Sequence, residues 1–248
     1  MIIYPKIDEK IKGIHSLKKY IDIYKGVELK LLEIDYKNMI INYETPINIL
    51  KDISPSIKEV TINMPSSFSS LEYFFFENLS KTKKLIKDII KYSNENKIKI
   101  NILFTLRWNY SISKILLLKN LKDLIKLIEG TKVTILFENV PYTEDTICTP
   151  LLICDEISSN HLKVCFDFKH FSKITYNMEE RFSTYVPTKY KKYIYQIHLS
   201  DTDNYINTIN KYKLNKKIFI VSVKEEDYSN RINQVKIIEH LEKKMKNE

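Results

Sequence analysis

Strand-like and helix-like segments alternate eight times along the chain, and this alternation restricts the fold more than any other feature of the sequence. Alternating strand and helix units imply parallel strands joined by right-handed crossovers. Eight such units in 248 residues predict an α/β protein with a closed (β/α)8 barrel, and we expect a single domain over residues 1–248. An open doubly wound sheet is the alternative. The chain has only three glycines, so it lacks the Gly-rich phosphate loop of many such sheets.

The boundaries of these elements follow from apolar runs, helical spacing and the residues that end helices. The expected strands are Met1–Tyr4, Val27–Ile34, Ile57–Met64, Ile98–Leu106, Thr131–Val140, Leu162–Phe168, Ile194–Leu199 and Ile218–Val223. The expected helices are Lys10–Tyr24, Ser70–Asn94, Ser113–Glu129, Pro150–Ser158, Tyr205–Tyr212 and Ser229–Lys244, with a short helical turn at Ile47–Leu50 and a mixed, partly helical stretch at Met178–Tyr193. Gly26 is well placed to end the first helix. The aromatic run Tyr73–Phe76 is expected to pack in the core or at an interface of a homo-oligomer.

Composition and charge indicate the cellular compartment and the kinds of partner to expect. Apolar residues make up 44% of the sequence, which is enough for a full core. No apolar run reaches the roughly 18 residues of a membrane span, so we expect no membrane partner. Three cysteines without a CxxC pair, and a first segment without signal-peptide features, favour the reducing cytoplasm. The net charge of +9 permits a nucleic-acid or phosphate partner without requiring one.

Three consecutive strands end in side chains that can bind a metal ion. Glu138, Asp167 and His198 each follow an apolar run, about 30 residues apart, the length of one strand and helix unit. The carboxyl ends of barrel strands form the active face, so these side chains are expected at one mouth of the barrel. Two carboxylates and an imidazole suit one divalent ion such as Mn²⁺, Mg²⁺ or Zn²⁺. A surface ion pair for Glu138, a loop cap for Asp167 and a core hydrogen bond for His198 are the structural alternatives.

The sequences around these residues carry a family resemblance. The runs Phe137–Pro141, Cys165–His170 and Ile197–Asp201 resemble the xylose isomerase-like barrel superfamily, which includes sugar and sugar-phosphate isomerases and epimerases and enzymes of the endonuclease IV type. The resemblance is best over residues 131–201. It implies that Glu138, Asp167 and His198 are metal ligands.

Further site residues follow from the same resemblance. The isomerase branch has a glutamate at the end of the last strand, and here either Ser222 replaces it or Glu225 supplies it. His170 is expected as a ligand or as a residue that supports one, and Asp201 as a helix cap or supporting residue. Arg107, with Trp108 beside it, would hold an anionic or sugar substrate at the rim.

The resemblance implies three functions. In a metal-dependent isomerase or epimerase acting on a sugar or sugar phosphate, the metal would stabilise an enediolate, Glu138 would be the base and Glu225 the second acid or base. An endonuclease IV-type nuclease is the alternative, but residues 64–67 and 105–108 lack the histidines that branch uses. A barrel that has lost catalysis and binds a ligand or partner is the third, favoured by Ser222.

Overall fold

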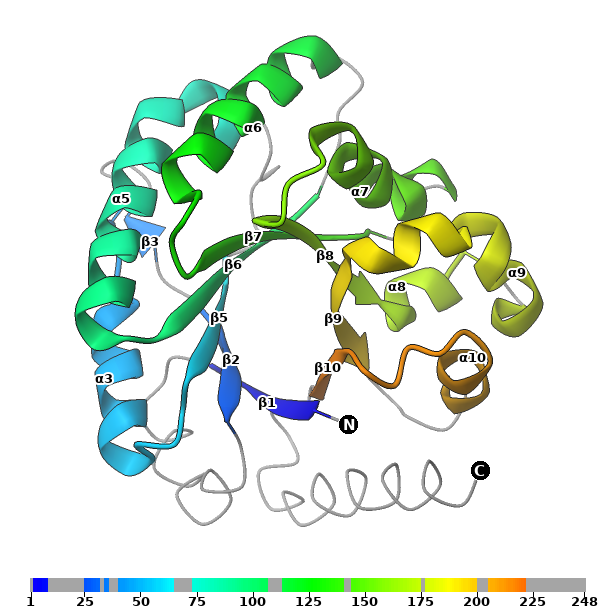
Figure 1. The fold of residues 1–248 in the computed structure, drawn as a ribbon, viewed down its shortest axis with the longest axis horizontal. Helices are drawn as coiled ribbons and strands as arrows, with labels where there is room; N and C mark the ends of the chain where they lie inside the picture. Colours follow the sequence, from blue (N-terminus) through cyan, green and yellow to red (C-terminus); the bar gives the residue numbers. More distant parts are fainter. Residues whose placement is uncertain are drawn as a thin grey trace.

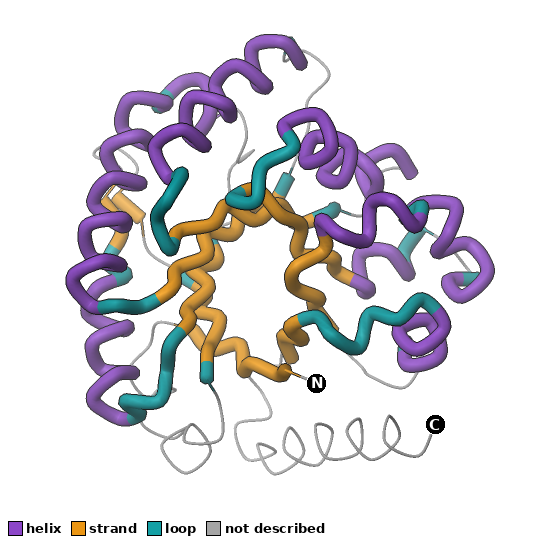
Figure 2. Tube along the Cα trace, viewed as in Figure 1, coloured by secondary structure: helices purple, strands orange, loops and turns teal. Residues whose placement is uncertain are grey.

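The computed structural model describes residues 2–8, 25–31, 34–35, 40–64, 73–106, 113–140, 144–174, 177–199 and 205–221. These residues form a closed barrel of parallel strands in the order β1-β10-β9-β8-β7-β6-β5-β2, surrounded by helices (Figures 1 and 2). The predicted (β/α)8 barrel is therefore confirmed. None of the helices in these ranges has the length and apolar character needed to cross a membrane.

The barrel strands lie close to the positions expected from the sequence. Their bounds are β1 Ile2–Asp8, β2 Gly26–Lys30, β5 Glu59–Asn63, β6 Lys99–Thr105, β7 Val133–Glu138, β8 Leu162–Asp167, β9 Ile194–Leu199 and β10 Ile218–Val221. The ring closes because β1 pairs in parallel with β10 on one side and with β2 on the other.

The helices cover the outside of the barrel. Their bounds are α3 Glu44–Ile53, a π-helix at Tyr73–Glu77, α5 Leu79–Asn96, α6 Lys114–Ile128, α7 Glu144–Ile157, α8 Phe168–Ser172, α9 Met178–Tyr185, a 3₁₀-helix at Thr188–Tyr193 and α10 Ile206–Lys211. Phe74 and Phe75 of the aromatic run are buried against Phe104, which confirms packing in the core. The helices expected at Lys10–Tyr24 and Ser229–Lys244 lie outside the described residues.

Several local predictions differ from the structure. The single helix expected at Ser70–Asn94 is a π-helix at Tyr73–Glu77 followed by α5, which begins at Leu79. The second strand ends at Lys30, and Ile34–Asp35 (β3) pairs antiparallel with Ile40–Ile41 (β4) in a separate two-stranded sheet. An apolar alternation cannot distinguish one long strand from two short ones. The turn expected at residues 47–50 is the ten-residue helix α3, because Ile47 and Leu50 bury one face of it. Helix α7 begins six residues before Pro150 and contains it, although proline lacks the N–H of an interior helical bond.

Gly26 begins β2, and its small size allows a close packing contact there. A Cβ atom at this position would lie 2.5 Å from the ring of Tyr4 and 2.8 Å from the carbonyl oxygen of Glu59. Real Cβ atoms do not approach other atoms so closely. This glycine therefore lets β1 and β5 approach β2 at the amino-terminal end of the barrel.

A cluster of phenylalanines fixes the chain just after β8. The ring of Phe166 packs edge-on against Phe168, Phe171 and Phe182, with centroid separations of 5.2 to 5.7 Å. Edge-to-face aromatic pairs contribute about 0.5–1.5 kcal/mol each beyond their buried area. The cluster anchors the short helix α8 and helix α9 on the barrel wall. It thereby sets the direction in which the chain leaves Asp167.

Candidate functional site

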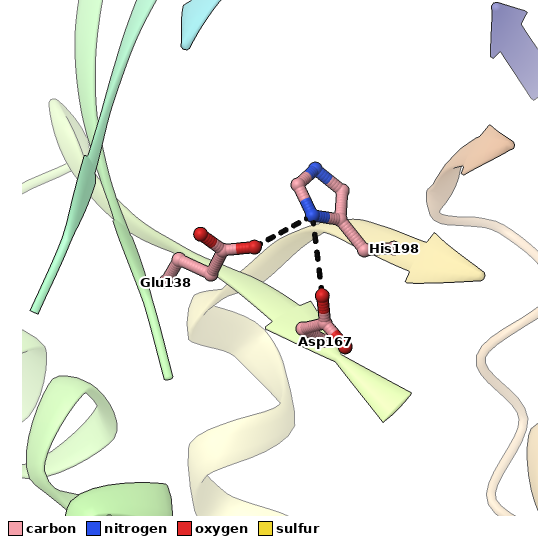
Figure 3. A group of neighbouring side chains, drawn as sticks. All are labelled: Glu138, Asp167 and His198. Atoms are coloured by element: carbon pink, nitrogen blue, oxygen red, sulfur yellow. Dashed lines mark hydrogen bonds and ion pairs between the residues drawn. The ribbon is translucent and has the colours of Figure 1, made fainter. Parts of the chain in front are cut away.

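Glu138, Asp167 and His198 come together at the carboxyl-terminal mouth of the barrel (Figure 3). One ligand-type atom from each residue lies within 4.8 Å of the other two. The Nδ1 atom of His198 is 2.7 Å from Glu138 Oε1 and 3.6 Å from Asp167 Oδ2. All three residues are buried. The convergence predicted from the three strand ends is therefore present in the fold.

The strand register explains why these side chains meet. Asp167 on β8 pairs directly with His198 on β9, so their side chains leave the sheet at the same height. Glu138 on β7 pairs with Cys165, two residues before Asp167. Side chains two residues apart on a strand point to the same face. Glu138 and Asp167 therefore both enter the barrel interior.

Asp167 is held by its neighbours on both the main chain and the side chain. The side chain of Asn139 accepts a hydrogen bond from Asp167 N at 2.7 Å and donates one to Asp167 O at 3.1 Å. Asp167 Oδ1 accepts from the main-chain N–H of His170 at 2.8 Å and caps α8. The predicted cap is therefore present and uses Oδ1, while Oδ2 faces His198 Nδ1.

His170 lies beside this group. Its Nδ1 is 2.7 Å from the carbonyl oxygen of Asn139 and 3.8 Å from Asp167 Oδ2. An imidazole nitrogen bonded to a main-chain carbonyl carries the proton at that nitrogen. His170 therefore links the start of α8 to the chain just after β7, and the choice between a ligand and a supporting residue stays a prediction.

A third acidic residue, Glu28 on β2, is the fourth member of the cluster and was not singled out in the sequence. Its Oε2 lies 2.7 Å from His198 Nε2, and its Oε1 lies 2.8 Å from the ammonium nitrogen of Lys6. Asn63 and Gln196 donate to the same carboxylate. Glu28 is fully buried, so every one of these contacts is shielded from water. The sequence offered one sign of this role, a glutamate within the alternating strand Val27–Leu31. Alternation shows that a strand has two faces, but it does not show which face points into the barrel.

The electrostatics of the cluster favour charged forms despite burial. Burial would raise the pKa of Glu28, but His198 and Lys6 hold it well below its usual range. Burial would lower the pKa of His198, but contact with Glu28 and Glu138 keeps it well above its usual value. Burial also opposes ionisation of Asp167, yet the hydrogen bond with His198 lowers its pKa to about 2. The raised pKa of His198 therefore favours the cationic ring between Glu28 and Glu138.

A column of polar side chains continues from this cluster through the barrel interior. Gln196 bonds to Glu28 on one side and accepts a hydrogen bond from Thr61 at 2.9 Å on the other. Asn101 donates to Thr61 at 3.2 Å and to Glu59 at 2.7 Å. The bonds of Gln196 join strands that are not neighbours in the sheet, so they cross the lumen. The column links the carboxyl-terminal mouth to the amino-terminal mouth.

The remaining predicted site residues fall in other parts of the sequence. Arg107, Trp108, Asp201, Ser222 and Glu225 all lie outside the described residues. The choice between Ser222 and Glu225 at the end of the last strand therefore stays a prediction.

The donor set fits a divalent ion. Glu28, Glu138 and Asp167 are three carboxylates, and Lys6 is the one ammonium group among the residues described around them. With a neutral His198, this leaves two negative charges, which a divalent cation balances. A neutral His198 can donate a hydrogen bond from Nε2–H to Glu28 and keep the Nδ1 lone pair for an ion shared with Glu138 and Asp167. A carboxylate behind a ligating histidine is the usual arrangement in protein metal sites.

Comparison with known proteins places the chain in a family. Residues 70–215 match the family model described as xylose isomerase-like TIM barrel. A xylose isomerase domain protein from Planctomyces limnophilus superposes with a TM-score of 0.64 at 11% identity, covering 99% of this chain and 98% of that chain. Endonuclease IV from Thermus thermophilus gives 0.62 at 11% identity, with 97% and 100% covered. A D-tagatose 3-epimerase-like protein gives 0.61 at 14% identity, with 98% and 99% covered.

At these identities the structural likeness concerns the fold alone. Comparison with curated proteins gives no significant match. The family model covers more than half of the chain, and it includes the three strands that carry Glu138, Asp167 and His198. The chain belongs to the xylose isomerase-like TIM-barrel family.

Proposed function

We propose that the chain is a divalent-metal-dependent enzyme that moves a proton on a sugar or sugar phosphate, as an isomerase or epimerase does. The observation that supports this most is the convergence of Glu138, Asp167 and His198, with Glu28 behind the histidine. In this proposal the first three residues hold the ion. A bound divalent ion would supply Lewis-acid polarisation of a substrate carbonyl and its neighbouring hydroxyl.

The chain's own residues prepare this site before substrate arrives. Glu28 accepts a hydrogen bond from the Nε2–H of His198 and so orients the ring with Nδ1 toward Glu138 and Asp167. Asn139 clamps the main chain of Asp167, so this carboxylate needs little rearrangement to bind an ion. Ligands held in place by such contacts bind a metal at a smaller entropic cost.

Glu138 is the candidate base for proton transfer. Its Oε2 accepts a hydrogen bond from Thr105 at 3.1 Å, and its Oε1 faces His198. The hydroxyl of Thr105 orients the carboxylate toward the mouth, where a substrate C–H would lie. A base must lie within hydrogen-bond reach of the proton that it removes. The second acid or base expected from the sequence, Glu225, remains part of the proposal.

Metal content tests the ligand set directly. Protein purified without chelator should contain about one equivalent of Mn²⁺, Mg²⁺ or Zn²⁺ by elemental analysis, or bind one on titration. Asp167→Asn should reduce the affinity at least tenfold, because it removes an anionic ligand. Glu95→Gln, which alters an exposed carboxylate on α5 paired with Lys91, is the matched control and should leave binding unchanged. Equal binding by both variants would contradict the assigned ligand set.

Exchange of substrate hydrogen tests the chemistry. The metal-loaded protein, incubated in deuterated water with a panel of ketoses, aldoses and their phosphates, should incorporate deuterium next to the carbonyl. Glu138→Gln should abolish this exchange. Absence of exchange across the panel by a metal-loaded protein would refute the isomerase proposal. Chelator-sensitive cleavage of a duplex with an abasic site would instead support the nuclease alternative, which the positive net charge favours.

A further inference from the structure

The amino-terminal mouth of the barrel contains a pocket of about 650 Å³, at the opposite end from Glu138, Asp167 and His198. Most of its lining residues lie at or just before the first residues of consecutive barrel strands. They are Tyr4, Lys25, Lys58, Glu59, Lys97, Lys99, Thr131, Lys132, Thr134, Asn160 and His161. Pockets of about 300–1,000 Å³ are the usual size for small-molecule sites. The volume is therefore sufficient for a ligand.

Five of the lining side chains are lysines, and within the described residues only Lys99 is matched by a carboxylate. Lys99 Nζ lies 3.4 Å from Glu59 Oε1, and the same carboxylate accepts hydrogen bonds from Tyr4, Tyr195 and Asn101. The charge of Glu59 is thus already balanced. The described part of the chain gives no ion pair to the lysines 25, 58, 97 and 132. About four positive charges therefore surround one opening.

The uncharged lining residues add hydrogen-bonding groups. Thr134 and Asn160 supply a hydroxyl and an amide group, while the hydroxyl of Thr131 already donates to the carbonyl oxygen of Ile128 at 2.7 Å. The ring of His161 is fixed, because its Nδ1 lies 2.8 Å from the carbonyl oxygen of Val133. Lysine ammonium groups bind phosphate oxygens as point charges, and neutral donors fix the orientation of the anion.

From this arrangement, we propose that the amino-terminal mouth binds a small anion that carries two or more phosphate groups. Several lysines without a carboxylate partner in the described structure, gathered around one opening, suit a ligand that concentrates several negative charges in a small volume. An extended nucleic acid would instead need a basic stripe that follows its backbone. Inorganic polyphosphate and a nucleoside triphosphate share the required chemistry. This site is independent of the reaction proposed at the other mouth.

Calorimetric titration of the full chain with inorganic tripolyphosphate at low ionic strength tests the proposal. We expect one site per chain, with orthophosphate binding more weakly and added salt reducing the affinity. Lys58→Gln combined with Lys132→Gln should weaken binding about tenfold, since the two changes remove two of the positive charges around the opening. Titration with a nucleoside triphosphate shows whether the base adds affinity beyond the phosphates.

The control removes the same charge elsewhere. Lys87 and Lys126 are exposed on the helices α5 and α6, outside this pocket, and the double change to glutamine should leave tripolyphosphate binding intact. Lys126 lies in the last turn of α6, where a positive charge stabilises the helix, so the informative measurement is ligand binding and not stability. Equal weakening by both double variants, or no saturable binding, would overturn the proposal. Tight binding of a single-stranded oligonucleotide that tripolyphosphate does not displace would also overturn it, in favour of a nucleic-acid surface.

Discussion

Replacing Glu28 by glutamine is the most demanding test of how the carboxyl-terminal mouth is built. Each oxygen of this buried carboxylate faces two donors: Oε1 faces Lys6 and Asn63, and Oε2 faces Gln196 and His198. A glutamine side chain has one oxygen and one NH₂ group. Whichever way the amide is turned, its NH₂ opposes two donors, so no orientation preserves the network.

The magnitude follows from these four contacts. Two donors lose a charge-assisted hydrogen bond worth about 1.5–3 kcal/mol each, and Lys6 loses its buried counter-charge. Breaking a buried ion pair by removing one partner costs about 3–5 kcal/mol, and we expect a loss of unfolding free energy in this range. That is a large part of the roughly 5–15 kcal/mol that stabilises a typical domain. Metal affinity should fall about 10- to 100-fold, because His198 loses its orienting partner.

Urea unfolding, followed by circular dichroism, measures the loss of stability in Glu28→Gln. The urea concentration at the midpoint of unfolding should fall, while the dependence of the unfolding free energy on urea concentration should not change. The control is Glu95→Gln, whose exposed partner Lys91 lies 3.9 Å away, and it should cost about 0.5 kcal/mol or less. Introducing Lys6→Met together with Glu28→Gln should cost less than the sum of the single changes, since the double variant leaves no buried ammonium unpaired. A loss for Glu28→Gln below about 1 kcal/mol, or strict additivity in the double variant, would refute this account of the cluster.

Three further predictions concern other parts of the barrel. Binding of a divalent ion at neutral pH should release about one proton, because the raised pKa of His198 favours a proton that the ion displaces. Calorimetry in buffers of different ionisation enthalpy measures the number of protons released. Release of no proton would contradict the assignment of His198 as a metal ligand. Burial raises the pKa of Tyr92 to about 12 and that of Tyr195 further still, so the folded protein should lose stability as the pH rises above about 10, the pKa of an exposed tyrosine. Absorbance at about 295 nm should show that these two phenols ionise only when the protein unfolds. Ionisation of both phenols in the folded protein would contradict the prediction. Gly26→Ala should cost about 1–3 kcal/mol by urea unfolding, since its Cβ meets the main chain at Glu59, and a neutral effect would show that this packing can relax.

The fold was predictable because each unit carries its own local signal. Apolar runs such as Val133–Phe137 and the leucine spacing of α6 each identify an element without reference to the rest of the chain. The convergence of Glu138, Asp167 and His198 also followed, because parallel strands bring their carboxyl ends to one edge.

The partners of this cluster could not be predicted in the same way. Lys6, Glu28 and Gln196 occur within strands, where alternation shows that two faces exist but not which face lines the lumen. The contacts of Glu28 with Gln196 and His198 span about 170 residues of sequence, and they exist only once the barrel closes. No local pattern encodes such contacts.

The polar column through the lumen has a consequence for the barrel as a whole. The interior of most such barrels is filled by layers of branched aliphatic side chains, which separate the two openings electrically. Here Gln196, Thr61 and Asn101 connect Glu28 at one opening to Glu59 at the other. Neighbouring dipoles in a hydrogen-bonded chain polarise one another when water is excluded. A charge gained or lost at Glu28 would therefore polarise the hydrogen bonds that reach Glu59, while the two openings keep separate side chains for any ligand.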